Sequence, residues 1–220
     1  EKTIFEYEDI KGEALAVPVS NINPYLVDAP DLVLEKRNQP ICLVPTISYG
    51  SMANDDGHLL LDKEQRNALI AAEPATAPYI RRYMGAQEFL NNAERWCLWL
   101  KDISPSLMRS SNELRHRIEA VRKFRASSNR EATRNLAATP SLFGEDRQPL
   151  KSYLLLPKVS SENRPYMPIG FMPSEVIANG SALTISDSGH YEMGVLQSKM
   201  HMAWMRAVAG RMKSDYQYSA

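Results

Sequence analysis

The spacing of apolar residues predicts several amphipathic helices in this chain. The clearest begins at Ser111 or Asn112 and continues to about Ala126, because its apolar side chains are three or four positions apart and would form one buried stripe. The stripe consists of Leu114, Ile118, Val121 and Phe124. Further helices are expected over residues 62–72, 79–84 and 129–137, and a methionine-rich helix is expected over residues 191–212.

Shorter apolar runs predict strands. They are rich in leucine, β-branched or aromatic side chains, and Pro, Gly and small polar residues separate them. The expected strands cover residues 95–101, 153–159, 166–172 and 182–186. Residues 1–60 look irregular instead, because five prolines interrupt their short β-like pieces. The expected fold class is therefore α+β, with a mixed, mainly antiparallel sheet and flanking helices.

The formal net charge of zero hides an uneven distribution of charge along the chain. Residues 1–75 contain six Lys and Arg against 13 Asp and Glu, whereas residues 76–220 contain 20 against 13. We therefore expect two parts, an acidic, turn-rich leader over residues 1–75 that packs on a neighbouring domain and a basic body over residues 76–220. The basic body suits an anionic partner. Charge blocks are also common on solvated surfaces, and this alternative stays open.

Basic side chains are concentrated on and next to the predicted helix 111–126. From Arg109 to Arg134 the chain has eight Lys and Arg against three Glu. In one interpretation these cations pair with DNA phosphates, and such contacts fix register without reading sequence. The candidate phosphate contacts are Arg115, Arg122, Lys123, Arg125, Arg134 and, farther along the chain, Lys158. In the other interpretation they are ordinary solvated cations that pair with the three glutamates.

A polar tip at residues 158–164 separates two of the predicted strands. Glu162 can accept a hydrogen bond from the N4 amine of cytosine, and Arg164 can donate two to O6 and N7 of guanine. Side chains at positions i and i+2 of an extended segment share a face, so the two residues would specify one base pair in the major groove. Asn163 would point to the backbone or to an adjacent base. The alternative is a hairpin tip with a local Glu162–Arg164 ion pair, which contributes little.

The chain shows no sequence motif of a catalytic, cofactor-binding or metal-binding site. Glycine-rich nucleotide-binding loops and a Gly-x-Ser-x-Gly elbow are missing, and the four histidines lack metal-ligand spacing. Cys42 and Cys97 are far apart in apolar contexts, which indicates buried free thiols of an intracellular protein. No apolar run approaches the roughly 20 residues that span a bilayer, so we expect no membrane partner.

Eight longer strings, distributed along nearly the whole chain, are informative together. They cover residues 23–30, 49–61, 95–100, 121–125, 139–144, 166–171, 200–206 and 214–219. Their order and spacing resemble the target-recognition region of the MmeI-like restriction–modification enzymes. Residues 51–58 match one of the family's strings, but the resemblance gives them no role.

The resemblance implies that this chain is the recognition part of a longer polypeptide. Members of the family join an N-terminal nuclease, a helical connector, an S-adenosylmethionine-dependent adenine-N6 methyltransferase, the recognition domain and a helical tail. The parent would then methylate and cut DNA in a bacterial cytoplasm, using S-adenosylmethionine and Mg²⁺. This fragment, which alone would be no enzyme and would hold no cofactor, would select the site. Its partners would be double-stranded DNA and the methyltransferase domain of the same chain.

The resemblance also implies where base contacts lie, around residues 160–166 and in the stretch 126–134. Matched to this sequence, the candidates are Ser161, Glu162, Asn163, Arg164, Asn129 and Arg130. A rival interpretation is a protein–protein interaction module, in which the acidic leader and the methionine-rich helix pack on another domain. Binding to duplex DNA that weakens steeply with salt would distinguish the two.

Overall fold

The computed structural model describes residues 2–9, 11–33 and 40–219. It divides into two compact units, Glu1–Val44 and Pro45–Ala220. In the smaller unit, β1 (Lys2–Tyr7) and β2 (Ala14–Val19) form an antiparallel hairpin. The division lies away from residue 75, where the charge changes sign, because Leu59, Leu61 and Leu69 belong to the core of the larger unit. The packing of an acidic leader on another domain stays a prediction.

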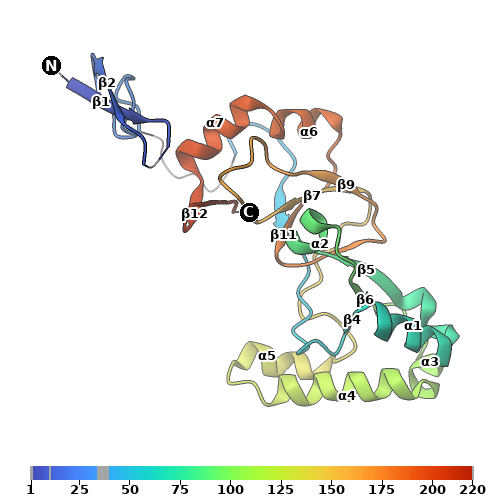
Figure 1. The fold of residues 1–220 in the computed structure, drawn as a ribbon. Helices are drawn as coiled ribbons and strands as arrows, with labels where there is room; N and C mark the ends of the chain where they lie inside the picture. The colour runs from blue at the N-terminus through green and yellow to red at the C-terminus, as the bar shows by residue number, and fades with distance from the viewer. Residues whose placement is uncertain (1, 10, 34–39, 220) are drawn as a thin grey trace. The chain divides into compact units, whose positions relative to one another are not determined.

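The first sheet of the larger unit has the strand order β10-β5-β6-β4. Its strands are β4 (Leu60–Leu61), β5 (Ile80–Met84), β6 (Trp96–Leu98) and β10 (Ile177–Ala178). β10 runs parallel to β5, and the other pairs are antiparallel. The helices at this end of the unit include α1 (Lys63–Ala72), α3 (Pro105–Ser110) and α4 (Asn112–Ala126) (Figure 1). Leu114 and Val121 of α4 belong to one core with Cys97 and Leu98 of β6.

The second sheet is antiparallel throughout and has the order β3-β11-β7-β9. Its strands are β3 (Ile47–Tyr49), β7 (Tyr153–Pro157), β9 (Gly170–Met172) and β11 (Ala182–Ile185). All five residues of β7 are buried, because the strand is covered on both faces. Leu154 and Leu156 share a core with Met202 and Met205, whereas Tyr153 faces a second core.

A third, smaller sheet joins the end of the chain to the segment that follows β7. Its order is β12-β13-β8. These strands are β8 (Val159–Ser160), β12 (Gly210–Met212) and β13 (Asp215–Gln217). The remaining helices are α2 (Ala86–Asn91), α5 (Glu131–Asn135), α6 (His190–Leu196), α7 (Lys199–Val208) and two 3-10 turns at Pro74–Tyr79 and Leu136–Ala138. The expected α+β class with mainly antiparallel strands is confirmed.

Local side-chain caps explain where the main helices begin. The Asp62 carboxylate accepts the N–H of Gln65, whose side chain in turn accepts the N–H of Asp62, so a complete capping box precedes α1. Ser111 caps α4 in the same way through the N–H of Leu114. Glu73 adds a carboxylate at the start of α4, where free N–H groups favour negative charge. The helices expected over residues 62–72 and 111–126 are therefore confirmed.

Three expectations about helices and cysteines are wrong. Residues 79–84 form no helix, because Ile80–Met84 is a strand held between β6 and β10. The methionine-rich segment is two helices, since Ser198 caps a new start at α7, and the chain then turns into β12. Cys42 is exposed, whereas Cys97 is buried as expected.

A close backbone contact at Asn179 joins the two large sheets. Asn179 lies between β10 of the first sheet and β11 of the second, and the N–H of Ser51 donates to the carbonyl of Ala178 at 2.7 Å. A Cβ at Gly50 would lie 2.2 Å from the carbonyl oxygen of Asn179, and one at Gly85 would meet its side chain at 2.1 Å. Gly50 therefore requires glycine, because the obstacle is backbone, whereas a side chain at Gly85 would first have to displace the Asn179 amide.

Replacing Gly50 with alanine should destabilise the larger unit by about 1–3 kcal/mol or more, because the methyl group would collide with backbone that cannot rotate away. The matched control is Gly194→Ala in α6, where a Cβ meets nothing within 4 Å. This change should stabilise the helix by up to about 1 kcal/mol. Urea denaturation of both variants measures the difference, and equal midpoints would contradict the predicted contact.

Candidate nucleic-acid interface

The polar tip after β7 is held at its base by the end of the chain. Ser160 and Val159 of β8 pair with Tyr216 and Gln217 of β13, and the N–H of Tyr218 donates to the carbonyl of Lys158 at 2.8 Å. On the other side, β7 and β9 pair from Tyr153 to Leu155, so the two apolar runs that flank the tip do lie side by side. The tip thus projects from strand β8, which is paired in a sheet.

The backbone of the tip forms a turn, not an extended segment. The N–H of Arg164 donates to the carbonyl of Ser161 at 3.1 Å, and Glu162 and Asn163 occupy the centre of this turn. The i, i+2 geometry of a strand therefore does not apply to Glu162 and Arg164. This corrects the sequence-based reason for placing them on one face.

The side chains of the turn differ in exposure. Glu162 and Asn163 are exposed, whereas Ser161 and Arg164 are half-buried. The guanidinium of Arg164 donates to the Ser160 hydroxyl at 3.3 Å, and the N–H of Glu162 lies 3.4 Å from a carboxylate oxygen of Asp215. Among the ion pairs of the described residues, none joins Glu162 to Arg164. The alternative of a local ion pair therefore has no support, and the Glu162 carboxylate faces solvent.

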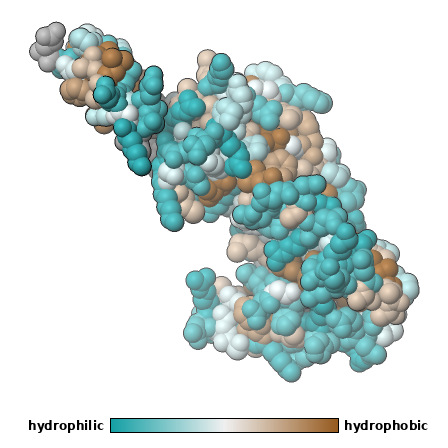
Figure 2. Space-filling model, viewed as in Figure 1, coloured by the Kyte–Doolittle hydropathy of each residue, from teal (hydrophilic) through white to brown (hydrophobic). Residues whose placement is uncertain are grey.

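Most of the predicted phosphate contacts lie on the surface of α4 and α5. Arg115, Arg122 and Lys123 are exposed on α4, as is Arg134 at the end of α5. Arg122 has an exposed Glu119 carboxylate 3.6 Å away, an arrangement that water screens and that leaves the cation accessible. Hydrophilic residues cover most of the visible surface over these helices (Figure 2).

Arg125 is the exception, and its prediction as a phosphate contact is wrong. Its side chain is 0% exposed, and its guanidinium donates five hydrogen bonds of 2.7–3.0 Å to backbone carbonyls. Burial lowers the pKa of Arg125 because the charged form loses water. Leu114, Ile118, Val121 and Arg125 are the buried positions of α4, so Arg125 occupies the end of the stripe in place of Phe124.

The candidate base contacts upstream lie in the loop between α4 and α5. Asn129 and Arg130 are exposed there, and the Arg130 carbonyl accepts the N–H groups of Thr133 and Arg134 at the start of α5. The Arg134 guanidinium reaches back across the loop to the carbonyl of Ser128 at 3.0 Å. The loop therefore presents its exposed side chains from a defined backbone.

Arg147, which the sequence analysis did not single out, lies near the same aromatic ring as Lys158. The Lys158 ammonium is 5.2 Å from the centre of the Tyr49 ring, and the Arg147 guanidinium is 5.9 Å from the same centre. Such distances fit cation–π attraction. Tyr49 is far from both cations in the sequence, so no local pattern predicts this cluster. Lys158 itself is half-buried.

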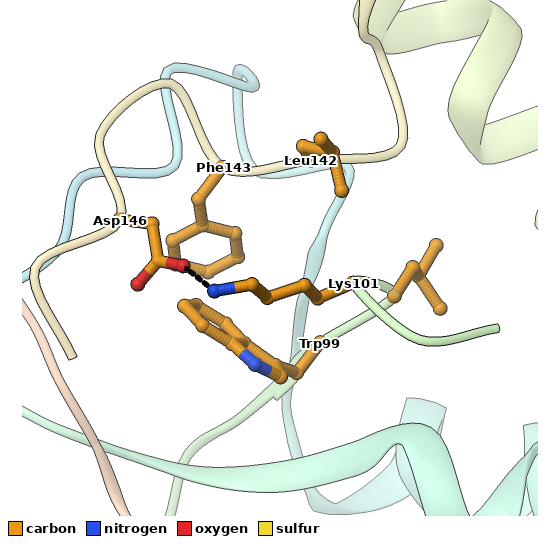
Figure 3. A pocket seen from close by; sticks show the side chains of 6 residues that line it. Trp99, Lys101, Leu142, Phe143 and Asp146 are labelled. Atoms are coloured by element: carbon orange, nitrogen blue, oxygen red, sulfur yellow. Dashed lines mark hydrogen bonds and ion pairs between the residues drawn. The ribbon is translucent and has the colours of Figure 1, made fainter. Parts of the chain in front are cut away.

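The cavity shown in Figure 3 is too small for a nucleotide cofactor. It measures about 90 Å³ and is lined by Trp99, Leu100, Lys101, Leu142, Phe143 and Asp146. The rings of Trp99 and Phe143 meet edge to face at 4.8 Å, and the Lys101 ammonium bonds Asp146 at 2.7 Å, which raises the pKa of Lys101. Ligand pockets usually measure about 300–1,000 Å³. This cavity is a packing gap.

Within residues 2–9, 11–33 and 40–219, no three His, Cys, Asp or Glu side chains are grouped so as to hold a metal ion. Over the same ranges, no helix combines the length and apolar character needed to cross a bilayer.

Known proteins resemble this chain over almost its full length. The relative DNA methyltransferase A of Bacillus subtilis (strain 168) is 37% identical over 202 residues, which are 92% of this chain and 23% of that protein. A solved structure of the type IIL restriction-modification enzyme MmeI in complex with DNA is 44% identical, with a TM-score of 0.88. The likeness covers 99% of this chain and 29% of the MmeI chain.

The chain therefore spans about a quarter of the length of these relatives. A family model described as "MmeI, target recognition domain" matches residues 28–220, well over half of the sequence. The earlier resemblance to MmeI-like enzymes is confirmed by this match and by the relatives. The chain belongs to the family of MmeI target recognition domains.

Proposed function

We propose that this chain reads the target sequence in double-stranded DNA for a longer restriction–modification enzyme. The observation that carries the proposal is the 44% identity, over 99% of the chain, to an MmeI enzyme whose structure was solved with DNA. The exposed turn at residues 161–164 and the exposed cations of α4 supply suitable chemistry.

Two groups of residues would make two kinds of contact with DNA. Polar side chains of the turn and of the α4–α5 loop would contact base edges, and they are Ser161, Glu162, Asn163, Arg164, Asn129 and Arg130. Cations would hold phosphates without preference for sequence, and they are Arg115, Arg122, Lys123, Arg134 and Lys158. Because Glu162 is exposed and the guanidinium of Arg164 is half-buried against Ser160, Glu162 is the freer of the two to meet a base.

The activities of the parent are part of the proposal. The relatives are named as a DNA methyltransferase and as a restriction-modification enzyme. We infer that the parent transfers a methyl group from S-adenosylmethionine to the N6 atom of adenine and cuts DNA with Mg²⁺, in a bacterial cytoplasm. This chain would dock on the methyltransferase domain of the same polypeptide.

Reversing the charges of the turn should change one position of the recognised site. Glu162→Lys with Arg164→Asp exchanges an acceptor for a donor, and a lost base contact costs about 1–3 kcal/mol at one base pair. The full-length parent is expressed in a methylation-free host, and its modified adenines are mapped by long-read sequencing. One altered position with the rest of the motif intact is expected.

The matched control is Lys151→Asp with Asp187→Lys, which reverses an exposed pair 4.0 Å apart outside the candidate residues. It should leave the motif unchanged. If the turn variant also keeps the original motif, the turn does not read bases. If the parent methylates adenine at no defined sequence, the proposed function itself is wrong.

Neutralising the surface of α4 should weaken DNA binding without changing the motif. Arg122→Gln and Lys123→Gln should each reduce the salt dependence of binding by about one unit of slope, equally for target and non-target duplexes. Fluorescence anisotropy of the full-length parent with both duplexes, over a salt series, measures this. Lys63→Gln on α1, which removes an exposed cation near Glu94, is the control and should keep the slope. DNA binding that does not weaken as the salt concentration rises would favour the rival interpretation, a protein–protein interaction module.

A further inference from the structure

Arg125 places a full charge where none of the described carboxylates forms a hydrogen bond or an ion pair with it. The guanidinium has five N–H donors, and all five are used by carbonyl oxygens. Asp55 is a nearby buried carboxylate that favours the charge, but it accepts from the N–H of Leu59 and makes no bond to Arg125 among the described contacts. A buried cation of this kind persists only where its surroundings satisfy every donor.

The five carbonyls belong to two segments that are far apart in the sequence. Nε and one Nη2 bond reach the carbonyls of Asn54 and Ala53, at 2.9 and 2.8 Å. The other three bonds reach residues that follow α5, at 2.7–3.0 Å. These acceptors are the carbonyls of Leu136, Thr139 and Leu142. Three of the strings that carry the family resemblance, at residues 49–61, 121–125 and 139–144, therefore meet at one side chain.

This arrangement closes the α4–α5 loop at its base. The loop leaves α4 after Ala126 and leads into α5, and directly after α5 the Arg125 guanidinium donates to the carbonyl of Leu136 at 3.0 Å. Within the closed loop lie the exposed Asn129 and Arg130. A loop fixed at both ends loses most of its freedom, so the direction of its side chains depends on the closure.

We propose that Arg125 is a positioning residue for base readout, which holds the α4–α5 loop so that Asn129 and Arg130 keep one orientation toward DNA. The inference rests on the proposed function for its link to DNA, but the closure itself does not. It also gives residues 51–58 a role, since their turn supplies two of the five acceptors.

The test compares two arginines of the same helix in the full-length parent. Arg125→Lys keeps the charge but offers at most three donors, without the planar fork, and Arg125→Met removes charge and donors. Arg122→Met removes an exposed arginine one turn earlier. The three readouts are amide hydrogen exchange, the methylated motif and the salt dependence of binding to target duplex.

The two positions should give opposite results. For both Arg125 variants we expect exchange over residues 127–136 to become about tenfold faster or more, with β7 unchanged, because hydrogen bonds from a charged donor are lost. We further expect one or two motif positions to relax while the salt slope stays the same. Arg122→Met should lower the slope by about one and leave both exchange and motif as they were.

Three outcomes overturn the proposal. Exchange over residues 127–136 that matches the unsubstituted enzyme means that Arg125 does not fix the loop. Faster exchange in β7 as well, even for Arg125→Lys, means that Arg125 only supports overall stability. A faster loop with an unchanged motif means that the closure has no part in readout. If the unsubstituted parent shows no motif at all, the proposed function fails, while the exchange result still decides whether Arg125 closes the loop.

Discussion

The close approach of backbone around Asn179 is the constraint on which the rest of the larger unit depends. β10 pairs with β5 of the first sheet, and the chain enters β11 of the second sheet directly after it. A side chain at Gly50 would collide with backbone at this point, and one at Gly85 would meet the Asn179 amide. The α4–α5 loop belongs to the first sheet's half and the turn at residues 161–164 to the second sheet's half. The two groups of candidate base contacts therefore belong to parts of the unit that this junction connects.

Hydrogen bonding, not ion pairing, satisfies the buried charge of Arg125. A buried ion pair must recover the cost of removing two charges from water, whereas five carbonyl dipoles around one guanidinium satisfy a single charge and organise two loops. The exposed arginines of α4 are different, since water screens their pairs with glutamate. One helix thus carries arginines for two purposes, and only their burial distinguishes them.

Local signals made part of this fold predictable from sequence. Asp62 and Ser111 marked the starts of α1 and α4, and the leucine run at β7 identified a buried strand. β5 was missed because Ile80–Met84 has no clear period and is a strand only through partners elsewhere in the chain. The burial of Arg125 had one available signal, since its position continues the stripe of Leu114, Ile118 and Val121. Arg125 was nevertheless predicted to contact phosphate, because arginine is usually exposed. For the polar tip, sequence predicted composition and place, but its turn depends on β13, which no local pattern reveals.

The pairing of β8 with β13 also affects the order in which parts of the protein can fold during synthesis. The turn at residues 161–164 is synthesised well before Asp215–Gln217, the strand that completes its sheet. Among the described residues, the apolar core around α4, by contrast, consists of residues up to Phe143, with Ile177 as the one later buried member. The two groups of candidate base contacts therefore complete their folding at different stages of synthesis. The turn at residues 161–164 takes its final shape only when the β12–β13 hairpin has emerged. A ribosome-bound chain can therefore hold α4 and most of its apolar core before the turn at residues 161–164 has its partner strand.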